Sequence, residues 1–407
     1  MNMKTTDFTQ RNVAIDIFRA LTMLLMVFVN DFWSVKGVPG WMQHATWDQD
    51  MLGLSDVVFP CFLFVVGMSI PYSMERRFSK GLSGVSTVGH ILTRSLALLL
   101  MGVFIVNTEA GIAPETGLSP AIYKILMVIG FILIWNDYPL SVTSRIKQIF
   151  TLLKIAGILL LFYLALIFRD TEGGVLQSRW WGILGLIGWS YLICSFTYLF
   201  TRDRLKYLIP FWLTLIILCI TISITREGIT LLNLQKDNFL KDFLRILHIG
   251  NGALPAFTTG GMILSIIAAK YKHLIISKKT ISVLIITATL FLAGFISHKY
   301  WIISKIQETP PFLFYCLAIS VGVYYIIYLL AENGKAHWFN IIKIAGTATL
   351  TCYLVPYITY SVSSLIGIQL PEWMISGFVG LLKCAAFSFL VIGITYLLGK
   401  VRIKLKI

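Results

Sequence analysis

Charged residues are scarce in this sequence of 407 residues: Asp, Glu, Lys and Arg make up only 13% of it, whereas 57% of the residues are hydrophobic. A soluble core cannot bury that much apolar surface, so the composition excludes an ordinary soluble protein and predicts a polytopic membrane protein. Acidic residues are the scarcest charged type, which leaves a formal net charge of +15. The basic residues lie in short links between apolar runs, so we interpret them as topology signals and expect no nucleic acid partner.

Motifs for several chemistries are also missing. The six cysteines lie in apolar runs and form no CxxC, so we expect small core residues, neither disulfides nor metal ligands. No pair of histidines has metal-ligand spacing, and we expect no metal site. There is no G-x-S-x-G elbow, Walker loop or dinucleotide fingerprint, so the sequence does not encode nucleotide hydrolysis. The polar start also predicts that there is no cleavable signal peptide.

Long apolar runs are what the sequence has in abundance. Runs of about 17 to 25 residues, each long enough to cross a bilayer as a helix, recur about twelve times. They lie near residues 14–33, 54–74, 90–107, 120–136, 150–168, 181–200, 206–225, 253–269, 280–297, 311–331, 343–363 and 375–398. No internal repeat or soluble domain interrupts them. We therefore expect an all-α bundle of about twelve transmembrane helices that forms a single domain over residues 1–407.

The basic residues predict the orientation of this bundle. If the N-terminus is cytoplasmic, the links on that side hold most of the Lys and Arg, as the positive-inside rule requires. These links lie at residues 75–81, 144–148, 201–206 and 270–279, together with the C-terminal tail. We expect both termini in the cytoplasm, a multi-pass protein of the cell inner (plasma) membrane, and the loop of residues 30–53 on the periplasmic side.

A longer outer segment, from Thr225 to Gly252, has a helical pattern of its own. Its apolar residues recur at helical spacing among Lys and Asp, and they are Phe239, Leu240, Phe243, Leu244 and Leu247. This pattern predicts an amphipathic helix that lies on the membrane face. A lid that packs on neighbouring loops explains the pattern equally well.

The stretch from Asn30 to Ile70 organises the rest of the chain. It holds a polar loop, with His44 followed closely by Trp47 and Asp48, and Asp56 stands where the next apolar run begins. A short link between membrane helices needs only a few turn residues, so we interpret this loop as the site of the chemistry. A base, an orienting carboxylate and an aromatic wall can meet here, and either Asp48 or Asp56 can supply the carboxylate.

Other ionisable groups lie at membrane depth, where each needs a partner or a function. Asp16 and Arg19 are one helical turn apart near the inner end of the first run. They form either an ion pair at the helix boundary or, through Arg19, a contact to the phosphate or amide of a cofactor. Asn30 and Asp31 end the same run on the outer side, close to the His44 loop. They are either an ordinary polar helix end or part of the site.

Two strings in this region resemble a known family. RNVAIDIFRALTMLLMVFVN and HATWDQDMLGLSDVVFPCFLFVVGMSI resemble the membrane region of the heparan-α-glucosaminide N-acetyltransferase family and its bacterial relatives. Those proteins have a D-x-F-R-G start, an F-V-N helix end, an H-A-x-W loop and a D-L-V-F-P-x-F-x-F helix. The resemblance is strong over residues 12–73 and weaker at residues 250–264 and 344–354. Here Ala20 replaces the family's glycine, and Asp48 replaces its usual asparagine. Residues 137–230 are expected to hold two more helices than the human-type core of the family.

The resemblance implies a transmembrane acetyltransferase that uses cytoplasmic acetyl-CoA as co-substrate and acetylates an amino sugar on the other side. His44 falls on the family's catalytic histidine, as general base, and Asn30 on its active-site asparagine, as a hydrogen-bond donor to the oxyanion. Trp47 and Asp31 are the residues that we expect to contact the saccharide. The motif core is 12–73, followed by variable helices at about 137–230 and later helices at 250–407.

The donor needs basic residues on the cytoplasmic side, because CoA has phosphates. We expect Arg19, Arg76 and Arg77 to bind it, with Asp16 beside Arg19. Two other functions stay open: O-acetylation of a surface polysaccharide, and secondary transport by a protein with about twelve helices. Transfer by way of an acetylated His44 stays open beside direct transfer. The expected partners are acetyl-CoA, the amino sugar and the lipid bilayer, and a homodimer is left open.

Overall fold

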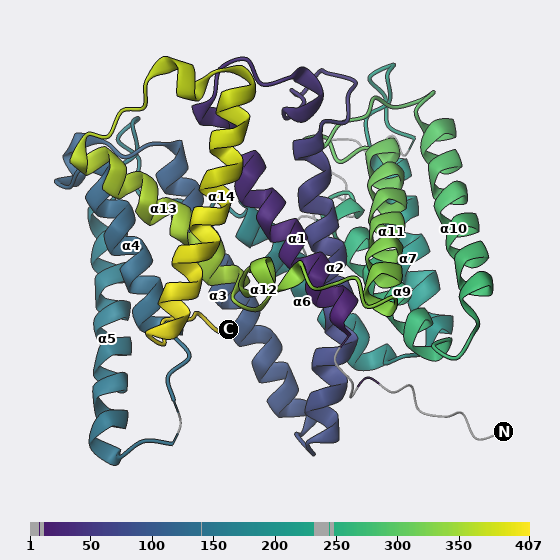
Figure 1. Ribbon diagram of the computed structural model, residues 1–407, viewed down its shortest axis with the longest axis horizontal. Coiled ribbons are helices and arrows are strands. Elements are labelled where there is room, and N and C mark those ends of the chain that lie inside the picture. Colours follow the sequence, from purple (N-terminus) through teal and green to yellow (C-terminus); the bar gives the residue numbers. More distant parts are fainter. Residues whose placement is uncertain (1–7, 9–11, 140, 232–243, 245–247) are drawn as a thin grey trace. The chain divides into compact units, whose positions relative to one another are not determined.

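The computed structural model describes residues 8, 12–139, 141–231, 244 and 248–407, and the regular elements in that part of the chain are all helices (Figure 1). The long helices before the outer segment are α1 (Val13–Asn30), α2 (Leu54–Ser79), α3 (Gly84–Ala110), α4 (Pro120–Trp135), α5 (Ser144–Ile167), α6 (Ile183–Thr201) and α7 (Leu205–Ile222). Those after it are α9 (Ala253–Lys270), α10 (Ile276–Ser297), α11 (Pro310–Glu332), α12 (Phe339–Thr347), α13 (Thr349–Ile366) and α14 (Gly377–Lys400).

The twelve spans expected from the sequence each coincide with helix. Ten helices in the described part are long and apolar enough to cross a membrane, α4 is a shorter apolar helix, and α12 with α13 passes the same test only as a bent pair, which is either a broken span or a re-entrant loop. The prediction of an all-α polytopic membrane protein is therefore confirmed. The amphipathic helix expected around Phe239–Leu247 lies outside the described residues.

The bent span differs from the continuous helix expected over residues 343–363. The axes of α12 and α13 meet at 91°. Ala348 between them has φ −130° and ψ 44°, which is not a helical conformation. A break of this kind at membrane depth frees backbone groups, which neighbouring protein must satisfy. Just after the break, the Thr351 hydroxyl in the first turn of α13 accepts a hydrogen bond of 2.9 Å from the backbone N–H of Leu405, which ties α13 to the C-terminal segment.

The helices gather into two compact units. Unit 1 comprises Met1–Thr22, Pro39–Ser95 and Trp189–Asn340, and unit 2 comprises Met23–Val38, Leu96–Gly188 and Ile341–Ile407. The helices α1, α3 and α6 each begin in one unit and end in the other. The expectation of a single domain over residues 1–407 stays a prediction.

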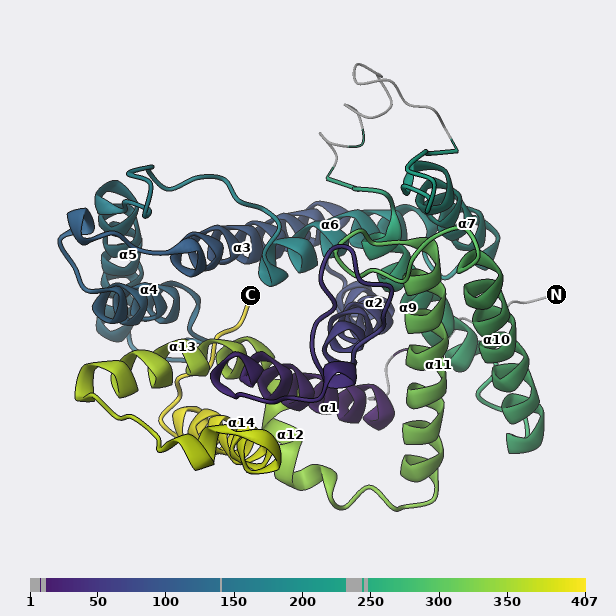
Figure 2. The same cartoon turned by 90° about the horizontal axis from the view of Figure 1, so that it is seen from above.

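In unit 1, α2 packs along α9, while α11 packs between α9 and α10 (Figure 2). The α2–α9 contact is close because glycines face the partner backbone on both sides. A Cβ atom on Gly67 would overlap the carbonyl of Thr258, and one on Gly261 would overlap the carbonyl of Phe64. Small residues at a helix interface are the usual means of close packing in membranes, where no hydrophobic force drives helices together.

This contact gives a stability prediction. We expect Gly261→Ala to destabilise the protein by about 1–3 kcal/mol, because the added methyl group has to push backbone apart. The apparent melting temperature of the purified protein in detergent measures the effect. Gly89→Ala is the matched control, because a Cβ at Gly89 of α3 meets nothing within 4 Å. Equal melting temperatures for the two variants would contradict the prediction.

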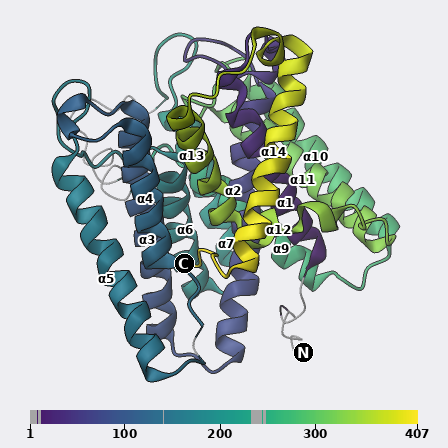
Figure 3. The same ribbon diagram turned by 60° about the vertical axis from the view of Figure 1, so that its left-hand side comes forward.

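In unit 2, α4 packs against α5 and α13, and α13 packs against α14 (Figure 3). The buried hydroxyl of Tyr123 in α4 donates a hydrogen bond of 3.0 Å to the carbonyl of Leu164 in α5. The chain end is tied in as well, because Asn136 and Leu405 form an isolated antiparallel bridge. These contacts fix α13, which supplies three tyrosines to the cavity described below.

Candidate active site

The first polar centre, in unit 1, is built on the start of α2. Asp56 lies in the first turn of α2, and its carboxylate is only 1% exposed. One oxygen accepts hydrogen bonds from the backbone N–H groups of Ala45, at 3.0 Å, and Gly53, at 3.3 Å. A carboxylate is favourable at a helix N-terminus, where backbone N–H groups lack partners within the helix. Asp56 therefore folds the loop back onto α2.

The other oxygen of Asp56 holds His44. The imidazole Nδ1 lies 2.8 Å from Asp56 Oδ1. A carboxylate only accepts hydrogen bonds, so in the neutral ring the proton stays on Nδ1 and the lone pair is on Nε2. The His44 side chain is 48% exposed, and no hydrogen bond to Nε2 is found among the described residues. The ring is thus oriented with a basic nitrogen available to a substrate.

A lysine from a distant loop completes this group. Lys305, in the link between α10 and α11, places its Nζ 3.3 Å from His44 Nδ1 and 3.9 Å from Asp56 Oδ1. Burial lowers the pKa of Lys305 below its usual range, and the charge of Asp56 offsets part of that effect. Lys305 gives the buried carboxylate a counter-charge, which leaves His44 between the two.

The loop is also anchored by a carboxylate that the sequence analysis missed. Asp50 accepts hydrogen bonds from the backbone N–H of Ile303, at 2.7 Å, and from the side chain of Arg226, and it lies 2.8 Å from His298 Nε2. Although burial raises it, these hydrogen bonds leave the pKa of the Asp50 carboxyl below its ordinary value. The acid that was expected near the histidine, Asp48, instead accepts a hydrogen bond from the Thr46 hydroxyl at 2.8 Å.

A cavity of about 270 Å³ opens next to Trp47, whose side chain is 56% exposed. Its lining includes Asn251, Gln307 and Glu308. Gln307 donates a hydrogen bond of 2.8 Å to the carbonyl of Trp47, and Asn251 donates one of 2.7 Å to that of Glu308. Burial raises the pKa of the Glu308 carboxyl to about 7. An aromatic ring beside amides and a carboxyl group is a surface that suits a saccharide.

The pKa of Glu308 gives a pH prediction. Because the folded state holds the proton more tightly than the unfolded state, this carboxyl stabilises the fold fully below pH 4.5, and the contribution is lost as pH rises through about 7. The melting temperature should therefore fall between pH 5 and pH 8. We expect Glu308→Gln to remove this dependence, worth about 3 kcal/mol. Glu227→Gln, at an exposed position, is the control. A pH profile that Glu308→Gln leaves unchanged would refute the assignment.

The second polar centre is a cavity of about 750 Å³ in unit 2 that contains Asn30. Asn30 is the last residue of α1. The helices α3, α4 and α13, which are distant from it in the sequence, supply other parts of the cavity wall. Its polar and aromatic lining comprises Asn30, Trp33, Glu109, Lys124, Tyr353, Tyr357, Tyr360, Ser361 and Ser364. Tyr357 donates a hydrogen bond of 2.8 Å to the Glu109 carboxylate, and its hydroxyl lies 3.4 Å from that of Tyr353.

Asp31 contributes to unit 2 in a different way from its neighbour Asn30. It is 0% exposed, and Lys383 of α14 donates to both of its carboxylate oxygens, at 2.8 and 3.0 Å. The hydroxyls of Tyr360 and Ser34 also donate to it, at 2.6 and 3.1 Å. Asp31 thus forms a buried ion pair with Lys383, and its carboxylate has a full set of hydrogen bonds. It supports the cavity through Tyr360 and is not among the residues that line it.

The residues expected to bind the donor have different partners in the fold. Arg19 lies 3.3 Å from Asp16 and donates a hydrogen bond to Ser69 of α2, which matches the ion-pair interpretation. Arg77 donates to the carbonyl of Ser86 in α3 at 3.1 Å, and Arg76 is exposed in the last turn of α2. Both lie at the opposite end of α2 from Asp56, about 30 Å along the helix axis.

Lys305, Lys383 and Glu109 were missed because their partners are distant in sequence. A signal existed for Lys383, which is a charged residue within the apolar run of α14 and so needed a partner. Among the described residues, no group of three or more His, Cys, Asp and Glu side chains is arranged to hold a metal ion. The six cysteines are all buried and free.

Comparison with known proteins confirms the resemblance seen in the sequence. The chain is 38% identical over 104 residues to heparan-alpha-glucosaminide N-acetyltransferase of Mus musculus and 36% identical over 105 residues to that of Homo sapiens. Each match covers 25% of this chain and 14% of the relative, so the chain spans only a small part of those proteins. A family described as "Domain of unknown function (DUF5009)" matches residues 11–240, more than half of the chain. The chain belongs to the DUF5009 family.

Proposed function

We propose that this protein is a transmembrane acetyltransferase that moves the acetyl group of cytoplasmic acetyl-CoA to the amine of a glucosamine-type saccharide on the periplasmic side. One observation supports this most: His44 is held by the buried Asp56 with its Nε2 open, in a stretch whose sequence resembles an N-acetyltransferase family. The activity in the names of the two relatives supports it too. We propose the inner (plasma) membrane as the location, because the links rich in Lys and Arg then face the cytoplasm, as the positive-inside rule requires.

In this proposal His44 is the general base. Its Nε2 takes a proton from the acceptor ammonium, and the neutral amine nitrogen attacks the thioester carbonyl of the donor. As the C–N bond forms and the C–S bond breaks, the nitrogen gives up its surplus proton, through water, to the CoA thiolate that leaves, and the proton held by His44 is released to solvent. Asn30 donates a hydrogen bond to the oxygen on which negative charge develops. Asp56 holds the tautomer of His44 that leaves Nε2 basic.

The Asn30 cavity is the proposed acceptor site. Its aromatic side chains, Trp33 and Tyr360, have ring centroids 5.5 Å apart in an edge-to-face arrangement, which suits the apolar faces of a sugar ring. Glu109 adds a carboxylate that can pair with an ammonium group. A hydroxyl acceptor has no positive charge for Glu109 to pair with, so this lining favours an amine over the O-acetylation alternative. Trp47 keeps its proposed contact with the saccharide, and Asp31 contributes to saccharide binding through Tyr360, whose hydroxyl it holds in the cavity wall.

Arg19, Arg76 and Arg77, with Asp16, remain the proposed residues for the CoA phosphates. We expect Arg19→Gln to raise the dissociation constant of acetyl-CoA about tenfold, because a charge-assisted hydrogen bond to phosphate is lost. Isothermal titration of the purified protein with acetyl-CoA measures it. An unchanged constant in a protein of unchanged melting temperature would leave Arg19 with its structural ion pair alone.

A direct assay tests the function as a whole. The purified protein is incubated with acetyl-CoA, and CoA release is measured with and without glucosamine. We expect release that depends on glucosamine and yields N-acetylglucosamine. Release that depends on a polysaccharide hydroxyl would favour O-acetylation. Movement of a saccharide across vesicles without acetyl transfer would favour the secondary transporter. Light scattering of the same preparation determines whether the protein forms a homodimer.

A further inference from the structure

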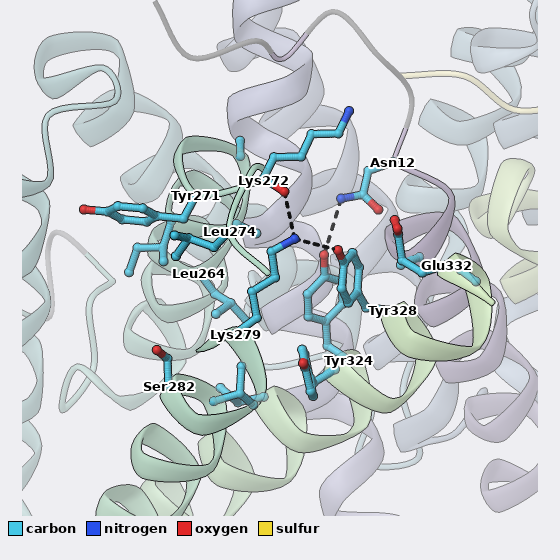
Figure 4. A pocket seen from close by; sticks show the side chains of 18 of the residues that line it. Asn12, Leu264, Tyr271, Lys272, Leu274, Lys279, Ser282, Tyr324, Tyr328 and Glu332 are labelled. Atoms are coloured by element: carbon cyan, nitrogen blue, oxygen red, sulfur yellow. Dashed lines mark hydrogen bonds between the residues drawn. The ribbon is translucent and has the colours of Figure 1, made fainter. Parts of the chain in front are cut away.

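Unit 1 holds a second cavity, of about 340 Å³, which takes no part in the proposed acetyl transfer. It is formed by the C-terminal halves of α9 and α11 and the N-terminal half of α10, with Asn12 at one side (Figure 4), and Tyr72 also lines it. The helix α11 begins just after the loop of Lys305, and its residues in this cavity belong to its other half. The cavity is therefore at the far end of unit 1 from His44.

One side of the cavity is polar, and its charged residues are two lysines, Lys272 and Lys279, and one carboxylate, Glu332, so that it is basic on balance (Figure 4). Lys279, in the first turns of α10, donates hydrogen bonds to the hydroxyl of Tyr328, at 3.0 Å, and to the backbone carbonyl of Lys272, at 2.8 Å (Figure 4). An ammonium group has three N–H donors, so two of them position Lys279 and one is left for an acceptor. On the same side Asn12 donates to the hydroxyls of Tyr72 and Tyr324, each at 3.3 Å.

The remainder of the cavity wall is apolar. It comes from three helices and comprises Leu264, Ile267, Ala268, Val283, Ile286 and Val321. The other face of α10 is exposed along its length, with Ile281, Leu284 and Ile285 each more than half exposed. In a membrane protein such a face contacts lipid. The cavity thus lies on the protein side of α10, whose other face contacts lipid. Its basic side is at the start of α10, and its apolar wall lies towards the middle of that helix.

The basic side of the cavity is expected at the cytoplasmic surface of the membrane, and its apolar wall deeper in the bilayer. The link of residues 270–279 is one of the basic links that the charge distribution assigns to the cytoplasmic side. Anionic lipids of the cytoplasmic leaflet attract Lys and Arg near the surface, and basic pockets between helices on that side bind their headgroups. An anionic phospholipid of that leaflet matches the cavity in this direction. Its charged headgroup would lie at the basic side, and its acyl chain would lie along the apolar wall.

We propose that this cavity binds an anionic phospholipid of the cytoplasmic leaflet. Its phosphate accepts a hydrogen bond from Lys279 with Lys272 nearby, and one acyl chain lies along Ile267, Val283 and Ile286. The tyrosine hydroxyls position the lysine and bound the headgroup. A free phosphate or a nucleotide lacks the chain that the apolar wall accommodates. The binding is independent of the acetyltransferase activity, so failure of either proposal leaves the other standing.

Thermal stability in detergent tests this site with lipids as probes. The full-length protein is purified, delipidated and melted with added phosphatidylglycerol, phosphatidylcholine or CoA. We expect phosphatidylglycerol to raise the melting temperature by several degrees, more than phosphatidylcholine does, and CoA to leave the response to phosphatidylglycerol unchanged. Native mass spectrometry should show one retained phosphatidylglycerol per chain.

Three variants locate the effect. Lys279→Ala removes the positive charge. Val283→Trp keeps that charge and fills the apolar part of the cavity. Each variant should abolish the difference in melting temperature between phosphatidylglycerol and phosphatidylcholine. Lys278→Ala, at an exposed position of the same turn that does not line the cavity, should retain it. Equal responses to the two lipids in the wild-type protein would overturn the proposal. So would a full response in Lys279→Ala, or a CoA response that competes with phosphatidylglycerol.

Discussion

Replacing His44 by alanine should lower kcat/KM for glucosamine-dependent CoA release by about a thousandfold, within the range typical for loss of a general base. The acceptor ammonium would then have to lose its proton to water, because no other histidine among the described residues lies within hydrogen-bond distance of Asp56. The fold should tolerate the change, because the His44 side chain is 48% exposed. The assay is steady-state CoA release by protein whose melting temperature is within a few degrees of the wild type.

Two carboxylates near His44 supply a matched pair of variants. Asp56→Asn should lower the rate about a hundredfold, because its amide cannot accept from His44 and from both backbone N–H groups at once. Asp48→Asn should leave the rate unchanged, since Asp48 accepts from the Thr46 hydroxyl and not from His44. Equal rates for the two variants would refute the role given to Asp56. Full activity in folded His44→Ala protein would return this loop to a structural role.

The same protein distinguishes direct transfer from a covalent route. If His44 attacks the thioester itself, incubation with radiolabelled acetyl-CoA and no acceptor should leave label on His44. In direct transfer the donor is stable until the amine is deprotonated, so no labelled His44 accumulates. We favour direct transfer, because Nε2 of His44 is the one basic nitrogen that this group offers and the proposed scheme already uses it for the proton. Stoichiometric label that passes to glucosamine would overturn this choice.

The helices were predictable from the sequence because the bilayer sets their length. A run such as residues 54–74 has to be helical and long enough to cross, whatever it packs against. The break at Ala348 was not predictable in the same way, because hydropathy is continuous across it. Whether a helix bends there depends on contacts with distant parts of the chain, such as the hydrogen bond from the Leu405 N–H to the Thr351 hydroxyl in the first turn of α13.

The site was predictable only in part. The sequence has two candidate carboxylates after His44, at Asp48 and Asp56, but spacing alone could not choose between them. The choice depends on how the loop folds, and Asp56 is favoured because it also accepts from the backbone N–H groups of Ala45, in the loop, and Gly53, just before α2. Lys305 is 261 positions away from His44 in the chain, so no local pattern reveals it.

Lys383→Met should destabilise unit 2 more than any other single substitution considered above. Asp31 is fully buried, and Lys383 is its one positively charged partner among the described residues. Removing one member of a buried ion pair leaves an uncompensated charge and costs about 3–5 kcal/mol, whereas replacing both members by uncharged groups of similar size costs far less. We therefore expect a large drop in melting temperature for Lys383→Met and substantial recovery in the double variant with Asp31→Asn.

Lys400→Met is the matched control, because it makes the same substitution at an exposed lysine in the last turn of α14. Its melting temperature should stay close to that of the wild type, and melting of Lys383→Met at that same temperature would show that the pair contributes no stability. The ion pair also holds the hydroxyl of Tyr360, which lines the Asn30 cavity. The double variant should therefore fold and yet bind glucosamine more weakly, with KM raised more than kcat is lowered, because Tyr360 loses its charged acceptor while His44 and Asp56 are untouched.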